Sequence, residues 1–565
     1  MARRRASAHH TARSSRRPRR LTTAAIAIAI CAALLATACA ADDTDPAAQQ
    51  GDGEPTKGGT LVVAISADPD HLNPAITTSG ATHTAAELLY NGLVRLDENG
   101  TPQPELAESW EVADDGARYV FQLRDDVTWH DGEPFTSADV TFAFEEVLLR
   151  YHSRTQASLG EALSGIETPD EHTVEFVFDE PYGPLLQQLD VTEAPIVAKH
   201  VYEGTDPLEN PANRKPVGTG PFTLERYRPD AEIRFAANEN YFKPDLPHLD
   251  RVVMRVIPEE SNQVVALESG EVQWLWGVPG PDLERLRADG RFEFLETSVN
   301  PGGANCIMTV TFNLDRPMFG DVDTRRAIAL AIDKQQFLDR VQFGQGKVAE
   351  APISSGISFA HAANLDGMPS HDPARAEQLL DDAGWVREDG EDTRVAKGVD
   401  GVTDGTPLAF DFLHFPDFAD YGELLRAQLA KIGADVELRP LESSVFVEKV
   451  FTERKFDTNV ISYCNGNDPE IGVKRMYLSS NIGPVPFSNA AGYRNPEVDA
   501  LFEEARSTVG DEERQAAYRR LQEQLVADMP YAWLVETTAT RVYNKRCGGF
   551  SHSGHFAAAA HCEAS

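Results

Sequence analysis

The stretch from Leu106 to Phe144 constrains the fold of this chain more than any other. It contains apolar residues that alternate with other residues, which predicts a strand with one buried face: Tyr119, Phe121 and Leu123. A turn at residues 114–116 (Asp-Asp-Gly) precedes this strand, and a second turn follows at residues 129–132 (Trp-His-Asp-Gly). Thr136 and Asp139 have the spacing of a capping box, which predicts that a helix begins there.

Further blocks follow this stretch in a fixed order. Residues 217–222 (VGTGPF) are glycine-rich, as expected where two backbone segments pass closely, and residues 238–242 read NENYF. Together these blocks resemble the family 5 solute-binding proteins, the peptide- and nickel-type receptors of bacterial ABC importers. The resemblance covers nearly all of residues 58–545. It implies an α/β, periplasmic-binding-protein-like fold: two α/β lobes with a ligand cleft between them, plus the extra domain of the large peptide-receptor subgroup.

The resemblance also implies a discontinuous arrangement of domains. The first lobe is expected to combine residues 58–91, 214–304 and 531–565. The extra domain is expected to span residues 92–213, and the second lobe residues 305–530.

Local signals predict several helices without reference to any family. Asp372 followed by proline is expected to cap and start a helix that ends at Gly384. Another helix is expected over residues 85–93, and a third from Asp511 to just before Pro530. Helices that alternate with strands on this scale indicate α/β lobes.

The N-terminal residues indicate export. Eight arginines within the first twenty residues form a basic segment without an acidic residue, and an apolar run of about a dozen residues follows at Ala24–Leu35. This run is too short for a comfortable transmembrane helix. We therefore expect residues 1–38 to be a signal peptide, exported by the general secretory route or, because of its arginine pairs, by the twin-arginine route.

The end of this segment resembles a bacterial lipobox, in which a cysteine is lipidated and becomes the mature N-terminus. The residues are Ala-Thr-Ala before Cys39, although Ala36 stands where leucine is usual. Residues 39–57 are rich in small and polar residues and contain no aromatic residue, which is typical of a flexible tether. We expect a domain anchored to the outer face of the cell membrane as a lipoprotein. A signal peptide cleaved nearby without lipidation is the alternative.

The charge of the chain excludes some partners. The chain has 52 basic and 89 acidic residues and a formal net charge of −37. Removal of the basic N-terminal segment would make it more acidic still. This composition argues against nucleic-acid binding and against a basic patch for anionic lipid.

Four cysteines lie beyond the N-terminal segment: Cys306, Cys464, Cys547 and Cys562. An even number in an oxidising exterior predicts two disulfides, and three pairings are possible. The family resemblance implies one of them, in which Cys306 bridges Cys464. Cys547 and Cys562 would then close a C-terminal loop.

The resemblance also implies a set of ligand-binding positions. They lie on a loop of the first lobe, at two cleft aromatics, on a strand whose backbone pairs with peptide, and on a polar loop that closes over it. These positions are Thr78, Ser79, Gly80, Trp276, Tyr463, Cys464, Asn465, Asp468, Ser488, Asn489 and Trp533. Core packing is the alternative for each aromatic residue.

Two positions depart from the pattern of the peptide-binding relatives. An aspartate that pairs with the peptide α-amino group is replaced by Asn465, and Asp468 is the nearest carboxylate. An arginine that meets the peptide carboxylate is replaced by Val460. A buried ammonium group without a partner is costly, so these changes argue against short peptides with free termini. Blocked peptides, longer peptides and neutral ligands such as oligosaccharides remain compatible with the sequence.

Three other interpretations fit parts of the sequence. A metal or nickel receptor is suggested by histidines near the C-terminus (His552, His555 and His561), but zinc-ligand spacing is absent and a disulfide with bystander histidines explains the cluster. An enzyme is suggested only by His130-Asp131, which a turn explains. A lipoprotein that senses peptide-like signals without transporting them is the third.

The sequence therefore predicts a receptor and not an enzyme. It is expected to bind a peptide or peptide-like solute without a cofactor or metal, and to work as a monomer. Its expected partners are ABC permease subunits and, through them, ATPase subunits.

Overall fold

The computed structural model describes residues 57–563 except 98–99, 161, 298–304 and 551–556. The expected signal peptide at residues 1–38 and Cys39 lie outside the described residues. Within the described residues, no helix is both long and apolar enough to cross a membrane.

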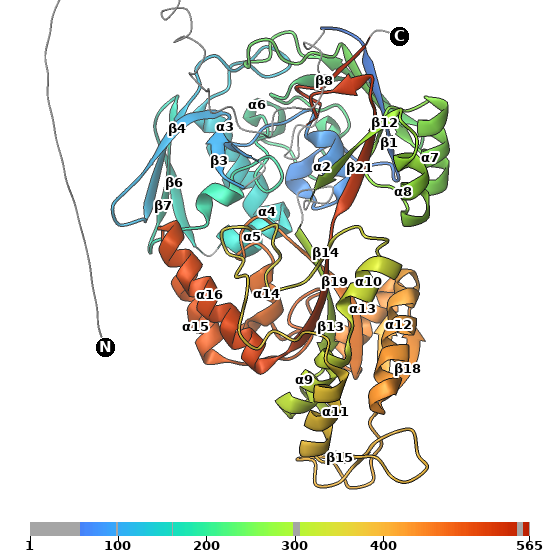
Figure 1. Ribbon diagram of the computed structural model, residues 1–565. Helices are drawn as coiled ribbons and strands as arrows, with labels where there is room; N and C mark the ends of the chain where they lie inside the picture. Colours follow the sequence, from blue (N-terminus) through green and yellow to red (C-terminus); the bar gives the residue numbers. More distant parts are fainter. Residues whose placement is uncertain (1–56, 98–99, 161, 298–304, 551–556, 564–565) are drawn as a thin grey trace, which may run out of the picture. The chain divides into compact units, whose positions relative to one another are not determined.

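One large sheet has seven strands in the order β12-β21-β11-β1-β10-β9-β8. Figure 1 labels β1, β8, β12 and β21 of this sheet. Strand β1 pairs in parallel with β10 and β11, and the other neighbours are antiparallel. The strands are β1 (Thr60–Ile65), β8 (Phe222–Arg228), β9 (Glu232–Ala237), β10 (Arg251–Val256), β11 (Trp274–Leu275), β12 (Phe292–Thr297) and β21 (Ala539–Asn544). Two helices contact this sheet, α7 (Glu260–Ser269) at β11 and α8 (Gly280–Arg287) at β12.

The second sheet has six strands in the order β14-β20-β13-β19-β17-β18. They are β13 (Asn305–Phe312), β14 (Lys347–Val348), β17 (Ala409–His414), β18 (Asp435–Pro440), β19 (Thr458–Asn465) and β20 (Tyr531–Thr537). The helices of this part are α9 (Val322–Ala331), α10 (Lys334–Arg340), α11 (Pro373–Asp382), α12 (Ala419–Leu429), α13 (Ser443–Val447), α14 (Val473–Tyr477), α15 (Pro496–Arg506) and α16 (Asp511–Asp528). Two parallel pairs, β17 with β18 and β17 with β19, combine with antiparallel neighbours to give a mixed α/β lobe.

A four-stranded antiparallel sheet contains the stretch that most constrained the fold. Its order is β4-β5-β7-β6, with β4 (Ala107–Val112), β5 (Arg118–Leu123), β6 (Leu163–Asp170) and β7 (Thr173–Phe178). The alternating residues of β5 are buried as predicted, at 1%, 0% and 4% exposure. The predicted capping box is also present, because Thr136 and Asp139 cap α3 (Ser137–Phe142) reciprocally.

Short elements complete the described chain. The helices are α2 (Gly80–Ala86), α4 (Leu149–Tyr151), α5 (Ser153–Leu159) and α6 (Lys199–Tyr202). Three two-stranded ladders pair β2 (Val94–Leu96) with β3 (Pro102–Pro104), β15 (Trp385–Val386) with β16 (Val395–Ala396), and β22 (Cys547–Gly548) with β23 (His561–Cys562).

Two of the three predicted helices are confirmed and one is wrong. Asp372 accepts a hydrogen bond from the Arg375 amide and caps α11, and α16 begins at Asp511 as predicted. The helix expected over residues 85–93 is wrong, because α2 ends at Ala86. Residues 88–90 are fully buried, so their apolar character reflects core packing of a non-helical segment.

Close backbone packing explains the glycine-rich segment at residues 217–222. A Cβ atom on Gly218 would lie 1.8 Å from the carbonyl oxygen of Leu89. The Gly220 amide donates to the same oxygen over 2.9 Å. Only glycine permits this approach, so the segment has the close crossing that the sequence predicted.

Two large hydrophobic cores organise the described residues. One core belongs to the six-stranded sheet and its helices, and its residues come from positions 307–535 of the sequence. The other is shared by the seven-stranded sheet and the four-stranded sheet. Strand β20 belongs to the six-stranded sheet and β21 to the seven-stranded sheet, so the chain passes between the sheets at Thr538. The first residues of the stretch 531–565 therefore pack with the second lobe.

Candidate ligand-binding site

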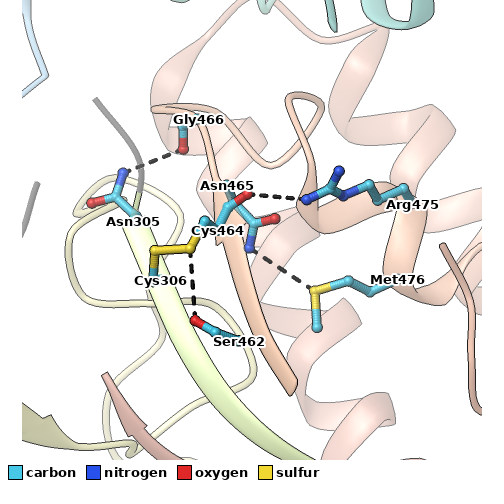
Figure 2. Close-up of a disulfide and its surroundings, with 8 residues drawn as sticks. All are labelled: Asn305, Cys306, Ser462, Cys464, Asn465, Gly466, Arg475 and Met476. Atoms are coloured by element: carbon cyan, nitrogen blue, oxygen red, sulfur yellow. Dashed lines mark hydrogen bonds between the residues drawn. A yellow bond between two sulfur atoms is a disulfide. The ribbon is translucent and has the colours of Figure 1, made fainter. Parts of the chain in front are cut away.

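The end of the β13–β19 ladder holds the best-defined part of the candidate site. Cys306 and Cys464 face each other in register and are joined by a disulfide (Figure 2). One pair further along, Asn305 faces Asn465, and the Asn305 side-chain amide donates to the carbonyl oxygen of Gly466. The second disulfide joins Cys547 and Cys562. Both bonds have the pairing that the family resemblance implied.

One edge of β19 is open. Strand β13 pairs with β19 along its whole length, from Thr458 to Asn465. On the opposite side, β17 pairs with β19 only at Thr458 and Asn459. Among the described residues no strand pairs with residues 460–465 on that side. A segment of β19 backbone therefore has a side on which an added strand can form hydrogen bonds.

The Tyr463 side chain of β19 is buried, and so are Ser488 and Asn489 of the polar loop. The Tyr463 hydroxyl donates to the carbonyl oxygen of Ser488 over 3.2 Å. The Asn489 side chain donates to the carbonyl oxygen of Tyr493 over 2.8 Å and accepts from the Gly492 amide over 3.0 Å. These polar groups are used inside the lobe, so this polar loop supports β19 from within and does not present free side chains.

Trp533 is also a core residue. Its exposure is 1%, and its indole nitrogen donates to the Tyr477 hydroxyl over 2.9 Å. The core-packing alternative thus describes its surroundings. Asn465 is 2% exposed, and its side-chain nitrogen faces the sulfur of Met476 at 3.9 Å (Figure 2).

Asp468 does not have the surroundings of a ligand contact. It is fully buried, and one carboxylate oxygen accepts from Arg514 over 2.6 Å. The other oxygen accepts from the Glu470 amide over 2.9 Å and lies 3.5 Å from the Tyr518 hydroxyl. Because both oxygens are already bonded within the protein, Asp468 is not available to pair with the ammonium group of a solute. The expectation that the Asp468 carboxylate contacts the ligand is therefore corrected.

The predicted loop of the first lobe is accessible. Thr78, Ser79 and Gly80 are exposed at the start of α2, where Ser79 is the residue before the helix. The ring of His83 forms a hydrogen bond with the carbonyl oxygen of Thr77 over 2.9 Å, and this bond connects the loop to α2. Burial lowers the pKa of His83 to about 4, so its ring is neutral at pH 7.

Trp276 is half-buried beside a guanidinium group. Its ring meets Trp274 edge-on at 5.6 Å, and the guanidinium of Arg541 lies 5.2 Å from the ring centre. Burial lowers the pKa of Arg541, and the charge of Glu87 acts in the opposite direction. Burial raises the pKa of Glu87 to about 7, although Arg541 opposes this. The predicted aromatic is therefore accompanied by a buried arginine that the sequence did not indicate.

A further arginine beside the open strand was also missed. Arg475, on α14, donates from Nη2 to the carbonyl oxygen of Cys464 over 3.0 Å (Figure 2). It follows Lys474 in a five-residue helix, a pattern with no local signal for binding. Only the packing of α14 against β19 brings its guanidinium to the disulfide.

The described residues contain no group of three or more histidine, cysteine, aspartate or glutamate side chains arranged to hold a metal ion. Cys547 and Cys562 are bonded to each other, and the ring of His561 lies 6.4 Å from that of His248. His552 and His555 lie outside the described residues.

The sequence model described as bacterial extracellular solute-binding proteins, family 5 Middle, matches residues 101–484, more than half of the chain. The chain belongs to this family. Its fold is that of the family 5 receptors, and these solute-binding proteins are not enzymes.

Individual relatives of this family 5 protein are distant but match almost end to end. Heme-binding protein A of Haemophilus influenzae is 26% identical, over 94% of this chain and 96% of that protein. Di/tripeptide-binding protein 1 of Pseudomonas aeruginosa is 28% identical, over 87% of this chain and 91% of that protein. The crystal structure of NikA from Brucella suis in complex with Fe(III)-EDTA is 26% identical, with a TM-score of 0.76 over 88% of this chain and 99% of that one. Relatives at nearly equal distance are thus named for different ligands.

Proposed function

We propose that this chain is the substrate-binding receptor of an ABC importer. It captures peptide-like solutes between its lobes and delivers them to permease subunits in the membrane, which act with ATPase subunits. Ligand contacts both lobes only when they are closed, so binding shifts the population toward the closed state. No bond in the solute is made or broken.

The open edge of β19 is the observation that carries the peptide assignment. Residues 460–465 belong to a strand that is paired along one side only, and in this segment the carbonyl oxygen of Cys464 accepts a hydrogen bond from Arg475. An extended peptide can add to such an edge, and its backbone then binds independently of its sequence. Relatives named for di- and tripeptides and for oligopeptides are consistent with this mode.

The proposed contacts come from both lobes. The accessible loop Thr78–Gly80 and the ring of Trp276 belong to the first lobe, and the backbone of residues 463–465 to the second. The buried side chains of Ser488, Asn489 and Trp533 act in this proposal as supports behind the strand.

The α-amino group of a peptide would lack a carboxylate partner at the position expected for one. Asn465 is an amide, and the carboxylate of Asp468 is bonded to Arg514. The proposed cargo therefore has a blocked or solvated amino end, or is long enough for that end to reach water.

The proposed arrangement outside the cell rests on the N-terminal sequence. Residues 1–38 would be removed as a signal peptide, Cys39 would carry lipid, and residues 39–57 would be the tether. The receptor would then work as a monomer on the outer face of the membrane.

Native mass spectrometry tests this function directly. A Cys39→Ser variant, which cannot be lipidated, is purified gently and weighed together with whatever it retains. A ladder of peptide masses is expected. A single non-peptide mass, such as a sugar, a heme or a metal chelate, would reject the peptide assignment and leave the receptor fold intact.

A further inference from the structure

Arg475 is a cation with unused donors beside the open strand. Its guanidinium has five N–H groups. One of them donates a hydrogen bond, to the carbonyl oxygen of Cys464. Its Nε is buried and has no hydrogen-bond partner. Among the described residues, no carboxylate lies within 4.0 Å of its guanidinium, whereas Lys474 next to it is paired with Glu470. The charge of Arg475 is therefore not compensated by a nearby acid of the described chain.

The charge of a second arginine, in the extra domain, acts on Arg475. Arg154, on α5, pairs with Glu193 at 3.1 Å, and its Nε is also buried without a partner. The two guanidinium groups are close enough for the charge of Arg154 to add to burial in lowering the pKa of Arg475. Two cations that repel each other thus approach from different parts of the molecule.

Hydrogen bonds connect α5 to the second lobe. The Tyr182 hydroxyl donates to the carbonyl oxygen of Ser158 on α5 over 2.8 Å. The next residue, Gly183, donates its amide hydrogen to the carbonyl oxygen of Arg506 on α15 over 2.9 Å. This connection between the extra domain and the second lobe involves the side chains of neither Arg154 nor Arg475.

The side chains of Arg154, Glu193 and Arg475 together carry a net positive charge. Glu193 compensates Arg154, and Arg475 remains with a carbonyl oxygen only. Removing a cation from water without an anionic partner is costly. A carboxylate supplied by the solute would remove this cost, because the planar guanidinium matches the two oxygens of a carboxylate.

We propose that Arg475 receives a carboxylate group of the bound solute, with the charge of Arg154 adding to the attraction. This inference rests on the proposed function and specifies its substrate class: an extended peptide on β19 that carries a free carboxylate next to Cys464. The carboxylate belongs either to the C-terminus of the peptide or to an acidic side chain. The position of Arg475 replaces the arginine that is missing at Val460, and it lies on a helix and not on the strand.

Competition between peptide libraries tests the proposal. The full-length chain is exposed to an equimolar mixture of three hexapeptide libraries: one with free C-terminal carboxylates, one amidated and without acidic residues, and one amidated with a single glutamate. Bound peptides are eluted and counted by mass spectrometry. We expect at least tenfold enrichment of free-acid peptides over the amidated library without acids. Enrichment of the glutamate library over the amidated one would assign the carboxylate to a side chain instead.

Two variants locate the effect. Arg475→Gln and Arg154→Gln should each reduce the enrichment several-fold, with Arg475→Gln nearly equalising the libraries. Arg519→Gln is the matched control, because Arg519 is an exposed arginine of the same lobe paired with Glu523. Thermal unfolding confirms that each variant is folded. If Arg475→Gln does not fold, Arg154→Gln provides the test in its place.

Failure of the inference and of the proposed function give different results. Equal retention of all three libraries by the unmodified chain overturns the carboxylate site and leaves peptide binding intact. Retention of none of them overturns the peptide assignment and the inference with it. Unchanged enrichment in both arginine variants also overturns the inference.

Discussion

The amide nitrogen of Gly183 lies 2.9 Å from the carbonyl oxygen of Arg506 and donates a hydrogen bond to it, which joins the extra domain to the second lobe. The guanidinium of Arg506 lies 5.9 Å from the ring centre of Tyr182 and 3.7 Å from the carboxylate of Glu180. A Cβ atom at position 183 would lie 1.9 Å from the carbonyl oxygen of Thr508. Backbone from two parts of the molecule can meet here because residue 183 has no side chain.

Replacing Gly183 by alanine should therefore hold these two parts slightly apart. A methyl group in a tight contact costs about 1–3 kcal/mol. If the cost falls on the closed state, solute affinity drops by about 5- to 150-fold. Isothermal calorimetry with a retained peptide measures the affinity, and small-angle X-ray scattering should show a larger radius of gyration.

Gly165→Ala is the matched control for this variant. Gly165 lies on β6 of the same extra domain, and a Cβ atom there would have nothing within 4 Å. It should bind solute as the unmodified chain does. Equal affinity and equal scattering for Gly183→Ala would show that the contact with Arg506 does not contribute to closure.

Asp468→Asn should destabilise the fold without changing peptide recognition. The variant leaves Arg514, which is 1% exposed, without its anionic partner at 2.6 Å. Breaking a buried pair on one side costs about 3–5 kcal/mol. Urea unfolding should show this loss, whereas Glu423→Gln, which breaks the exposed pair with Arg426, should cost under about 1 kcal/mol. A large loss of affinity in folded Asp468→Asn would restore Asp468 as a ligand contact.

The stability contribution of His130 should depend on pH. Its Nδ1 accepts from the Gly218 amide over 3.2 Å and its Nε2 lies 3.1 Å from the carbonyl oxygen of Gly220, which requires a neutral ring. Burial lowers the pKa of His130 to about 4. In the unfolded chain the pKa is about 6.5, so acid protonates the unfolded state first and the contribution is lost as pH falls from about 6.5 to about 4.

Urea unfolding of the unmodified chain and of His130→Asn at pH 7 and pH 5 checks this prediction. The unmodified chain should be the more stable at pH 7, and the difference in free energy of unfolding should shrink by about 2 kcal/mol at pH 5. The comparison cancels the opposite trend from Glu87 and Asp190, whose pKa values burial raises to about 7. A difference that is the same at both pH values would show that the ring is not held neutral.

The two disulfides should differ in their contribution to stability. Cys547 and Cys562 are 15 residues apart, and Cys306 and Cys464 are 158 residues apart. Chain entropy then predicts losses of about 3 kcal/mol for Cys547→Ser with Cys562→Ser and about 5 kcal/mol for Cys306→Ser with Cys464→Ser. Guanidinium unfolding of the two double variants measures both. A smaller loss for the 158-residue pair would mean that the β13–β19 ladder already keeps these residues together in the unfolded ensemble.

The sequence alone determined the local structure where the cause lies within a few residues. The alternation on β5, the capping box at Thr136 and the cap at Asp372 depend on neighbours along the chain, and all three are present. The glycine-rich segment at Gly218 was also identified, because a close backbone crossing restricts the residue type itself. The family and its fold followed from such blocks in order.

The tertiary structure alone decided which candidate residues are free to bind. Asp468 is bonded to Arg514, 46 positions further on, and Arg475 meets the charge of Arg154 from another part of the molecule. Neither relationship has a sequence signal, because it depends on which segments the fold brings to Asp468 and to Arg475 and not on spacing along the chain. Local hydrogen bonds and periodicity act over a few residues, whereas burial and charge pairing act between segments that only the folded chain brings together.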